Sequence, residues 1–480
     1  MNKLIGVYVD RIFCRRNAFF IVVFIILFKI FFSASIELHS DEAYYWLWSK
    51  NLALGYFDHS PMVAWFIKIT TLFSNCELAV RFSSIIITIV ISVLIWKLTK
   101  KLFNETIAAA SVITLNTLPE MMMGSIIITP DTPVFLFFSL AIYYLYYLIE
   151  TNKTKYWYIT GLFFGLSLLS KYTAVLFGLS LFVYIIADRK WPWFRNKHFY
   201  FMFCLSFILF LPVIIWNSQH DWVSFTFQLH HGLAGKTIHL SYIFEYLGSQ
   251  CLMAGPLIFI VGMLASVIYF CSKNSKKVFI STFTLSIITF FMFTAFKTPP
   301  EANWPALAYF AFSIVVCAYL LENNSKVKRK ILIYGVTFNF FISFILGLHV
   351  KYSIVPIWAF SRHAAIIDPT NEFYVWRLIG DNLLKRDIKY VIMASHQTAG
   401  AVAYYTRGKV NVLNGPKPGN QFKCWSIPDD LDYSKTAIVN EIDIDIEDDF
   451  NETDVIEVLR KGTPIRRYTV VESNGYKMEK

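Results

Sequence analysis

Two adjacent carboxylates follow directly on the first long apolar run of the chain. The run, Ala18–Ile36, is succeeded at once by Asp41 and Glu42 in a polar, aromatic stretch. Charged side chains at a membrane edge are costly unless water, an ion or a substrate uses them. A carboxylate in that place can deprotonate an acceptor hydroxyl, hold a metal ion or orient a sugar. The same residues after Ser40 also fit the start of a helix, and capping is compatible with catalysis.

A second acid, Asp131, lies in a short turn between two later apolar runs, flanked by Pro130 and Pro133. An acid in such a turn is often no more than a turn residue. The order of the runs nevertheless places it on the same face as Asp41. Two carboxylates from separate loops that meet in one cavity resemble an acid–base or metal-holding arrangement. We expect Asp41 and Asp131 to converge in this way.

Two cations are expected on the same outer face. Arg81 begins the second long run, and Lys171 interrupts two apolar segments with no other charge close by. Both positions match the depth of a lipid phosphate, and Arg and Lys bind phosphate well. Either side chain could instead extend to the interface without a ligand.

Apolar runs must position these groups. The chain has 480 residues, of which 56% are hydrophobic and 16% charged, less charge than a soluble protein of this length carries. Roughly 20 apolar residues span a bilayer. We identify eleven runs, at 18–36, 78–96, 106–126, 133–150, 156–170, 172–187, 199–216, 242–270, 279–296, 304–321 and 331–349. The short pair 156–170 and 172–187 could form one bent hairpin or a re-entrant element.

Lysine and arginine placement predicts the orientation. The N-terminus and every second turn after it are rich in Lys and Arg, whereas the opposite loops carry few. Positive loops stay in the cytoplasm, so the N-terminus is expected there. An odd number of spans then puts the Asp41 loop and the C-terminal tail outside the cytoplasm. The net charge of +11 is explained by the basic residues of these turns, which set the topology and contact anionic lipid headgroups. It does not indicate nucleic-acid binding.

The chain changes character near residue 350. We therefore expect a membrane domain over 1–350 and a small extracytoplasmic α/β domain over 351–480. Strands are predicted at 390–394, 410–413 and 436–439, and helices at 398–405 and 455–461. The seven cysteines show no paired spacing, so neither a zinc site nor a disulfide framework is expected. The first run holds Lys29 and is predicted to be an uncleaved anchor, although Ser33-Ala34-Ser35 resembles a signal-peptidase site.

Six short motifs in order carry a resemblance to a known family. They are Asp41-Glu42-Ala43-Tyr44-Tyr45, Tyr56-Phe57-Asp58-His59-Ser60-Pro61, Glu77-Leu78-Ala79-Val80-Arg81, Thr129-Pro130-Asp131-Thr132-Pro133, Leu169-Ser170-Lys171-Tyr172 and Glu301-Ala302-Asn303-Trp304-Pro305. Together they resemble bacterial GT-C glycosyltransferases of the protein O-mannosyltransferase-like group, which includes the lipid A aminoarabinose transferase. The resemblance covers about residues 15–320, and Gln421-Phe422-Lys423-Cys424-Trp425 extends it more loosely.

The resemblance implies an inverting transfer of a sugar from a polyprenyl (undecaprenyl) phosphate at the outer face of the bacterial inner membrane, with the active site and the C-terminal domain in the periplasm. Asp41 with Glu42, and Asp131, match the family's acids. Lys171 and Arg81 are the candidates for binding the lipid phosphate, and His59 stands where some relatives carry Lys.

The remaining predicted substrate-binding residues are Tyr56, Glu301 and Asn303, since aromatic faces beside polar side chains bind sugars. A divalent metal is possible, but no metal ligands are assigned.

The acceptor is expected to be lipid A or another lipopolysaccharide sugar. Protein O-glycosylation is the nearest alternative. A lipid-sugar flippase and a non-catalytic envelope scaffold are alternatives from other classes. Ten of the fifteen acids in residues 1–350 lie in or near outer segments, and this asymmetry favours a one-sided reaction site over a transport path.

Overall fold

The computed structural model describes residues 12–233, 237–323, 325–386, 388–414, 419–425, 435–442 and 454–472. The chain divides into two compact units, and both are discontinuous in sequence. The first contains residues 1–31, 59–63 and 83–344, and the second contains 32–58, 64–82 and 345–480. The division therefore differs from a single cut near residue 350, because parts of the first loop pack with the C-terminal segment.

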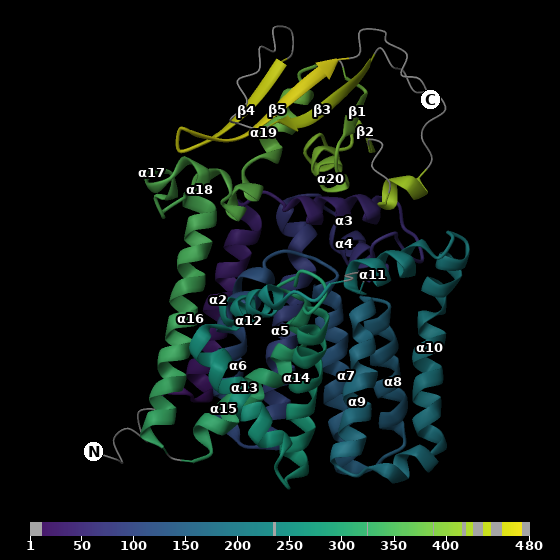
Figure 1. Cartoon of the computed structure of the whole chain (residues 1–480), viewed down its shortest axis with the longest axis vertical. Helices are drawn as coiled ribbons and strands as arrows, with labels where there is room; N and C mark the ends of the chain where they lie inside the picture. The colour runs from purple at the N-terminus through teal and green to yellow at the C-terminus, as the bar shows by residue number, and fades with distance from the viewer. Residues whose placement is uncertain are drawn as a thin grey trace. The chain divides into compact units, whose positions relative to one another are not determined.

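Helices make up most of the chain (Figure 1). Up to residue 352 the α-helices are α2 (Arg15–Ser35), α3 (Ser40–Lys50), α4 (Met62–Thr70), α5 (Glu77–Leu102), α6 (Glu105–Thr117), α7 (Asp131–Thr151), α8 (Lys155–Leu168), α9 (Leu176–Ala187), α10 (Lys197–Ser218), α11 (Val223–Leu233), α12 (Leu240–Ala254), α13 (Pro256–Phe270), α14 (Ser275–Thr294), α15 (Tyr309–Leu321) and α16 (Lys326–Tyr352). A π-helical turn, η1 (Glu120–Gly124), follows α6, and 3₁₀ turns η2 (Tyr172–Val175), η3 (Trp191–Arg195) and η4 (Trp304–Ala308) precede α9, α10 and α15.

Each of the eleven apolar runs lies on helical elements, so the polytopic helical fold is confirmed. Among the described residues, seven helices are long and apolar enough to cross a membrane. The run 242–270 forms α12 and α13, which are bent by 107°. Gly255 between them has a φ of +79° and Pro256 begins α13, so the backbone turns there. The runs at 106–126, 156–170 and 172–187 form shorter helices, and the last two are separate.

Helices α7, α8 and α10 pack side by side in the first unit (Figure 1). Two glycines of α8 permit the close approach to α10. A Cβ at Gly161 would lie 2.6 Å from the Met202 carbonyl oxygen, and one at Gly165 would lie 2.8 Å from Leu209 Cβ. Small residues at such contacts are typical of helices packed in a membrane. This packing fixes the ends of α7 and α8, which carry Asp131 and Lys171.

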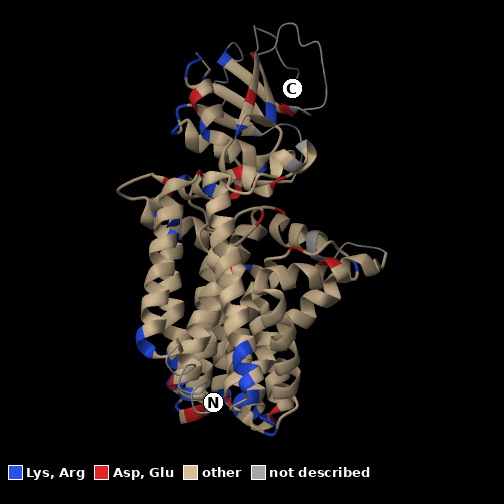
Figure 2. Ribbon diagram, turned by 90° about the vertical axis from the view of Figure 1, so that its left-hand side faces the viewer, with Lys and Arg blue, Asp and Glu red and all other residues tan. Residues whose placement is uncertain are grey.

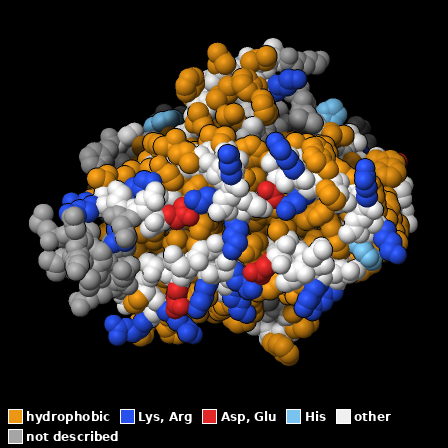
Figure 3. Space-filling model, turned by 90° about the horizontal axis from the view of Figure 1, so that it is seen from below, with side chains coloured by type: hydrophobic (Ala, Val, Ile, Leu, Met, Phe, Trp, Pro, Cys, Tyr) orange, Lys and Arg blue, Asp and Glu red, His pale blue; other side chains and the backbone are white. Residues whose placement is uncertain are grey.

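Basic side chains gather at one end of the first unit, as the view from below shows (Figure 3). In the ribbon of Figure 2, the same end carries many segments coloured blue for Lys and Arg. Lys101 bonds Glu150 at 3.0 Å there, and Lys277 bonds Glu322 at 2.7 Å. These turns are among those that the sequence assigns to the cytoplasm, while Lys3 and Arg11 of the same set lie outside the described residues.

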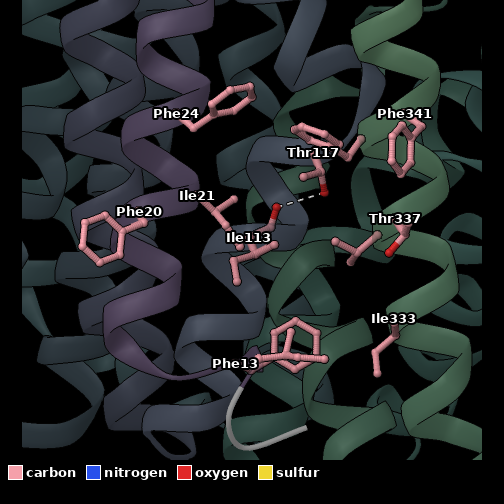
Figure 4. Close-up of a pocket in the computed structure, with 12 residues that line it drawn as sticks. Phe13, Phe20, Ile21, Phe24, Ile113, Thr117, Ile333, Thr337 and Phe341 are labelled. Carbon is pink, nitrogen blue, oxygen red and sulfur yellow. Dashed lines mark hydrogen bonds between the residues drawn. The ribbon is translucent and has the colours of Figure 1, made fainter. Parts of the chain in front are cut away.

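An apolar cavity of about 520 Å³ lies between α2, α6 and α16 (Figure 4). Its lining is aliphatic and aromatic apart from Thr117 and Thr337. The Thr117 hydroxyl donates to the Ile113 carbonyl oxygen at 2.9 Å, so its hydrogen-bonding capacity is met within α6. The lining of this cavity contains no charged side chain.

The second unit contains a five-stranded sheet in the order β2-β1-β3-β5-β4. The strands are β1 (Tyr390–Met393), β2 (Asn411–Asn414), β3 (Thr436–Ile442), β4 (Asp454–Arg460) and β5 (Thr463–Glu472). Strand β1 pairs in parallel with β2 and β3, whereas β5 pairs antiparallel with β3 and β4. The helical elements of this part are α17 (Ile357–Phe360), α18 (Arg362–Ile366), η5 (Pro369–Phe373), α19 (Trp376–Leu383), α20 (His396–Tyr405) and η6 (Gln421–Cys424).

The helix predicted at 455–461 is wrong, because this segment is strand β4. Burial alternates along it: Ile456 and Val458 are buried whereas Val455 and Leu459 are exposed. Lys461 and Gly462 follow with positive φ, the backbone of a two-residue hairpin turn. The hairpin to β5 overrides the helical propensity of the segment.

Helix α20 packs against α3 through Gly400. A Cβ on Gly400 would lie 2.6 Å from Tyr44 Cα, so only glycine lets the two backbones come this close. The C-terminal segment thus holds the helix that begins with Asp41 and Glu42.

Candidate functional site

In the first unit, Asp131 is held between a lysine and an asparagine. Lys171 Nζ lies 2.7 Å from Asp131 Oδ1 and 2.8 Å from Oδ2, and Asn303 Nδ2 donates to Oδ2 at 3.0 Å. The Lys171 side chain is 8% exposed and that of Asp131 is 19% exposed. Three of the predicted site residues therefore form one cluster.

Local backbone structure explains the cluster. Asp131 begins α7, where the helix dipole favours a negative charge. Lys171 is an extended residue, with φ −159°, between the end of α8 and η2. Asn303 stands directly before η4. Each side chain therefore comes from a break between apolar helices, where polar groups can be held away from lipid.

The segment that begins at His59 lies beside the same break. Ser60 Oγ donates to the Leu168 carbonyl oxygen at 3.0 Å, and the Met62 N–H donates to that of Leu169 at 3.2 Å. These bonds hold the half-buried His59 segment against the end of α8, close in sequence to Lys171. Glu301, by contrast, has an exposed side chain.

A further carboxylate that the sequence did not place in the site adjoins this cluster. Glu120 of η1 interacts electrostatically with Asp131 and Lys171. The signal that could have found it is an acid inside the apolar run 106–126, since charged groups at such positions are rare without a role.

In the second unit, Asp41 lies at the start of α3 with its side chain 39% exposed. Desolvation raises the pKa of Asp41, His39 lowers it, and Glu372 and Glu42 raise it. The His39 ring nitrogen Nδ1 accepts the Asp41 N–H at 3.2 Å. Asp41 therefore combines access to solvent with a carboxyl group that is more basic than usual.

A second acid, Asp58, lies close to Asp41. Tyr44 OH donates to Asp58 Oδ2 at 2.7 Å. The pKa of Asp58 is raised to about 7, because burial raises it most and the charge of Asp41 also raises it, while the hydrogen bond from Tyr44 lowers it. Asp58 is part of a motif in the sequence, but its carboxyl group was not predicted to act in the site.

The C-terminal segment contacts these residues through Gln421. The Gln421 N–H donates to Tyr44 OH at 3.0 Å, and Gln421 Oε1 accepts the Phe57 N–H at 2.7 Å. The imidazole of His396 packs on the Tyr44 ring, with centroids 4.6 Å apart. Burial lowers the pKa of His396 to about 4, so this ring is neutral at physiological pH.

Glu42 and Arg81 form a buried ion pair, and both side chains are 0% exposed. Arg81 NH2 lies 2.5 Å from Glu42 Oε2, and Nε lies 2.8 Å from Oε1. NH1 donates to the carbonyl oxygens of Ser33 and Ile36, each at 3.1 Å, and NH2 also donates to that of Glu37 at 2.7 Å. Glu42 Oε2 also accepts the His39 N–H at 3.0 Å, completing a capping box.

This geometry does not support Arg81 as a phosphate ligand or Glu42 as a catalytic acid. The guanidinium N–H groups are directed at protein acceptors, and neither side chain reaches solvent. The pair instead ties α5 to the end of α2 and the start of α3.

Tyr56 also has a structural role, because its side chain is packed inside the protein. Its side chain is fully buried, and its ring stacks on Trp48 with centroids 4.2 Å apart. The Tyr56 hydroxyl lies 3.1 Å from the Trp48 carbonyl oxygen and accepts the Ala53 N–H at 3.1 Å. A sugar cannot reach this ring without opening the loop, so the predicted binding role is not supported.

Within the described part of the chain, no three His, Cys, Asp or Glu side chains are grouped so that they could hold a metal ion. The structure therefore assigns no ligand set to the divalent metal that the sequence left possible.

Part of the chain is similar in sequence to known proteins. The family described as dolichyl-phosphate-mannose-protein mannosyltransferase matches residues 58–216. Lipid A galacturonosyltransferase RgtD of Rhizobium johnstonii is 28% identical over 285 residues, 57% of this chain. The match spans 59% of the length of that relative.

Solved structures extend the likeness to the whole fold. ArnT from Cupriavidus metallidurans bound to undecaprenyl phosphate matches with a TM-score of 0.68 at 12% identity, over 96% of this chain and 99% of ArnT. The apo state of ArnT matches with a TM-score of 0.64 at 13% identity, over 96% and 98%. The chain therefore shares the fold of ArnT. It is a multi-pass membrane protein in which seven described helices are long and apolar enough to span a bilayer, and it has a small C-terminal sheet domain.

Proposed function

We propose that this protein transfers a sugar from a polyprenyl-phosphate donor to lipid A or another lipopolysaccharide sugar on the periplasmic face of the inner membrane. The observation that carries the proposal is the Asp131–Lys171–Asn303 cluster, because it places a carboxylate and a cation in a break between apolar helices. The likeness to RgtD and to ArnT with bound undecaprenyl phosphate supports the donor and acceptor classes.

The chemistry requires one bond to break and one to form. The bond between sugar C1 and the phosphate oxygen breaks, the acceptor oxygen bonds to C1, and polyprenyl phosphate leaves with the electron pair. Negative charge grows on the leaving phosphate, and preorganised cations stabilise such charge. Lys171 is the proposed cation, and Asp131 with Asn303 would hold its ammonium at the correct depth.

Asp41 is the proposed second acid. If the acceptor is a hydroxyl, Asp41 takes its proton as general base. If the acceptor is a lipid A phosphate, the nucleophile is already anionic, and Asp41 orients the sugar instead. The two roles differ in pH dependence. With a hydroxyl acceptor, kcat/KM falls as pH drops through the raised pKa of Asp41, and Asp41→Asn removes most of the activity at every pH. With a phosphate acceptor, kcat/KM shows no pH dependence that arises from ionisation of Asp41.

The proposal requires Asp41 and Asp131 to act on one substrate, and their convergence stays a prediction. Replacing both with cysteine and treating membranes with bifunctional thiol reagents of graded length tests it. Cross-linking by a short reagent supports convergence. Cross-linking by long reagents alone, in a variant that still inserts and folds, rejects it.

The decisive experiment for the acceptor is mass spectrometry of lipid A from cells with and without the intact chain. A mass difference of one sugar, lost again in the Asp131→Asn variant, supports the proposal. Unchanged lipid A together with sugar lost from secreted proteins supports protein glycosylation, which the matching mannosyltransferase family favours as the second candidate.

The flippase and scaffold alternatives are tested with purified protein in vesicles. Release of polyprenyl phosphate that depends on added acceptor identifies a transferase. Movement of the lipid-linked sugar across the bilayer without its release identifies a flippase. Full cellular function of Asp41→Asn identifies a scaffold.

A further inference from the structure

Lys29 is a buried amino group in the apolar helix α2, and its side chain has no assigned role. It is 1% exposed. Its Nζ donates to the Met121 carbonyl oxygen at 2.8 Å and to Ser125 Oγ at 2.6 Å, and lies 3.4 Å from Thr88 Oγ1. A lysine ammonium has three donors, and the three acceptors are all neutral. A basic group so placed is expensive in a membrane and marks a functional position by default.

Two of these acceptors belong to the π-helical turn η1 or follow it directly. A π-turn is wider than an α-helical turn and is frequent at functional sites. The Ser125 hydroxyl also donates to the Met121 carbonyl oxygen. Lys29 and Ser125 therefore converge on one carbonyl of the turn, and Thr88 joins α5 to the same amino group.

The turn held by Lys29 also contains Glu120. The Glu120 carboxylate lies over Gly124 of the same turn, where an added Cβ would be 3.1 Å from Glu120 Oε1. Glu120 interacts electrostatically with Asp131 and Lys171. Lys29 therefore anchors the backbone of a turn whose carboxylate is coupled by its charge to the Asp131–Lys171 pair.

We propose that Lys29 is a positioning residue, which fixes the turn η1 and through it Glu120 and the Asp131–Lys171 pair. The inference rests on the proposed transfer reaction for its effect on rate. Its structural half, that Lys29 holds residues 120–125, is independent of any activity.

The first test is hydrogen exchange of purified protein in nanodiscs. Lys29→Met removes the donors and keeps a chain of similar length. Amides of 120–125 should exchange at least about tenfold faster, while those of α8 and α10 stay unchanged, because only the local turn loses its anchor. Thr99→Val, a buried threonine on the same helix as Thr88, is the matched control and should leave both regions unchanged. Unchanged exchange at 120–125 in Lys29→Met overturns the proposal.

The second test measures kcat and donor KM for the same variants. Lys29→Met should lower kcat roughly 10- to 100-fold with little change in KM, as expected for a misplaced reacting group. Ser125→Ala should lose part of this activity, and Lys29→Arg should restore part of what Lys29→Met loses. An equal loss in Lys29→Met and Lys29→Arg contradicts the positioning role.

A double-mutant cycle separates positioning from general damage. If Lys29 acts through Asp131, then Lys29→Met lowers kcat far less in the Asn303→Ala background than in wild type. Additive losses reject the coupling. If hydrogen exchange responds but no transfer occurs even in wild type, the proposed function fails while the anchoring of η1 by Lys29 stands.

Discussion

The Lys171 ammonium donates hydrogen bonds to both carboxylate oxygens of Asp131, with Nζ 2.7 Å from one oxygen and 2.8 Å from the other. The pair is largely buried, so each charge depends on the other. A donor phosphate that enters would compete with Asp131 for the same ammonium. The pair is therefore suited to exchange one anionic partner for another without leaving Lys171 unpaired.

Lys171→Met should lower kcat/KM at least about 100-fold, because it removes the cation that stabilises the leaving phosphate. Asn303→Ala should lower it by about tenfold, the effect of one lost hydrogen bond. Kinetics with a synthetic polyprenyl-phosphate sugar measure both. The control is Lys297→Ala, which changes an exposed lysine close in sequence to Asn303 and should retain activity. A Lys171→Met variant with normal kcat/KM contradicts the assignment.

Arg81→Met should destabilise the second unit by about 3–5 kcal/mol, because it leaves the Glu42 carboxylate buried and unpaired. Thermal unfolding in detergent measures the loss. Arg81→Met combined with Glu42→Leu should recover part of it, since no charge is then left alone. Lys100→Met, which breaks an exposed pair with Glu105, should leave the melting temperature nearly unchanged, because solvent screens the attraction between exposed charges. Normal stability with lost donor binding in Arg81→Met would restore Arg81 as a phosphate ligand.

Asp58 should make the stability of the second unit depend on pH. Its pKa is about 7 when folded and about 4 in an unfolded chain. The folded state therefore binds the proton more tightly, and this contribution is fully present below about pH 4 and is lost as pH rises through 7. Asp58→Asn should flatten the decline in melting temperature between pH 5 and pH 8. Identical pH slopes for the variant and wild type would show that Asp58 titrates normally.

Gln421→Ala should lower kcat by about tenfold, because the Phe57 N–H loses its acceptor and the loop bearing Asp58 loosens. The backbone bond from Gln421 to Tyr44 remains in this variant. Kinetics and limited proteolysis of residues 51–61 measure the two effects. Lys423→Ala, an exposed side chain on the same turn η6, should change neither. If Gln421→Ala keeps full activity and residues 51–61 stay resistant to the protease, Gln421 does not hold this loop.

Much of the fold follows from the sequence because its signal is local. Each apolar run lies on helical elements, and three strands of the C-terminal sheet were predicted near their observed places. Segment 455–461 was not, because its alternation is short and its strand conformation depends on pairing with β5 across the turn at Lys461 and Gly462. Similarly, the bend at Gly255 depends on one backbone angle that hydropathy does not report.

The candidate site was only partly predictable for the same reason. Motif order identified Asp131, Lys171 and Asn303 as candidates, but their pairing is a contact between distant residues. Arg81 and Tyr56 were predicted to face a substrate, yet both are buried within the protein. An isolated motif gives the residue type and does not give the direction of its side chain.

The sequence alone determined the membrane class, the helical runs and the set of polar residues interrupting them, because hydropathy and residue type act over a few neighbouring positions. Tertiary structure alone decided that Lys171 pairs with Asp131, that Glu42 is bound to Arg81, and that Lys29 reaches the turn at Met121. Those outcomes depend on which buried donors and acceptors meet when distant helices pack, since a buried polar group must find its partner wherever the fold brings one.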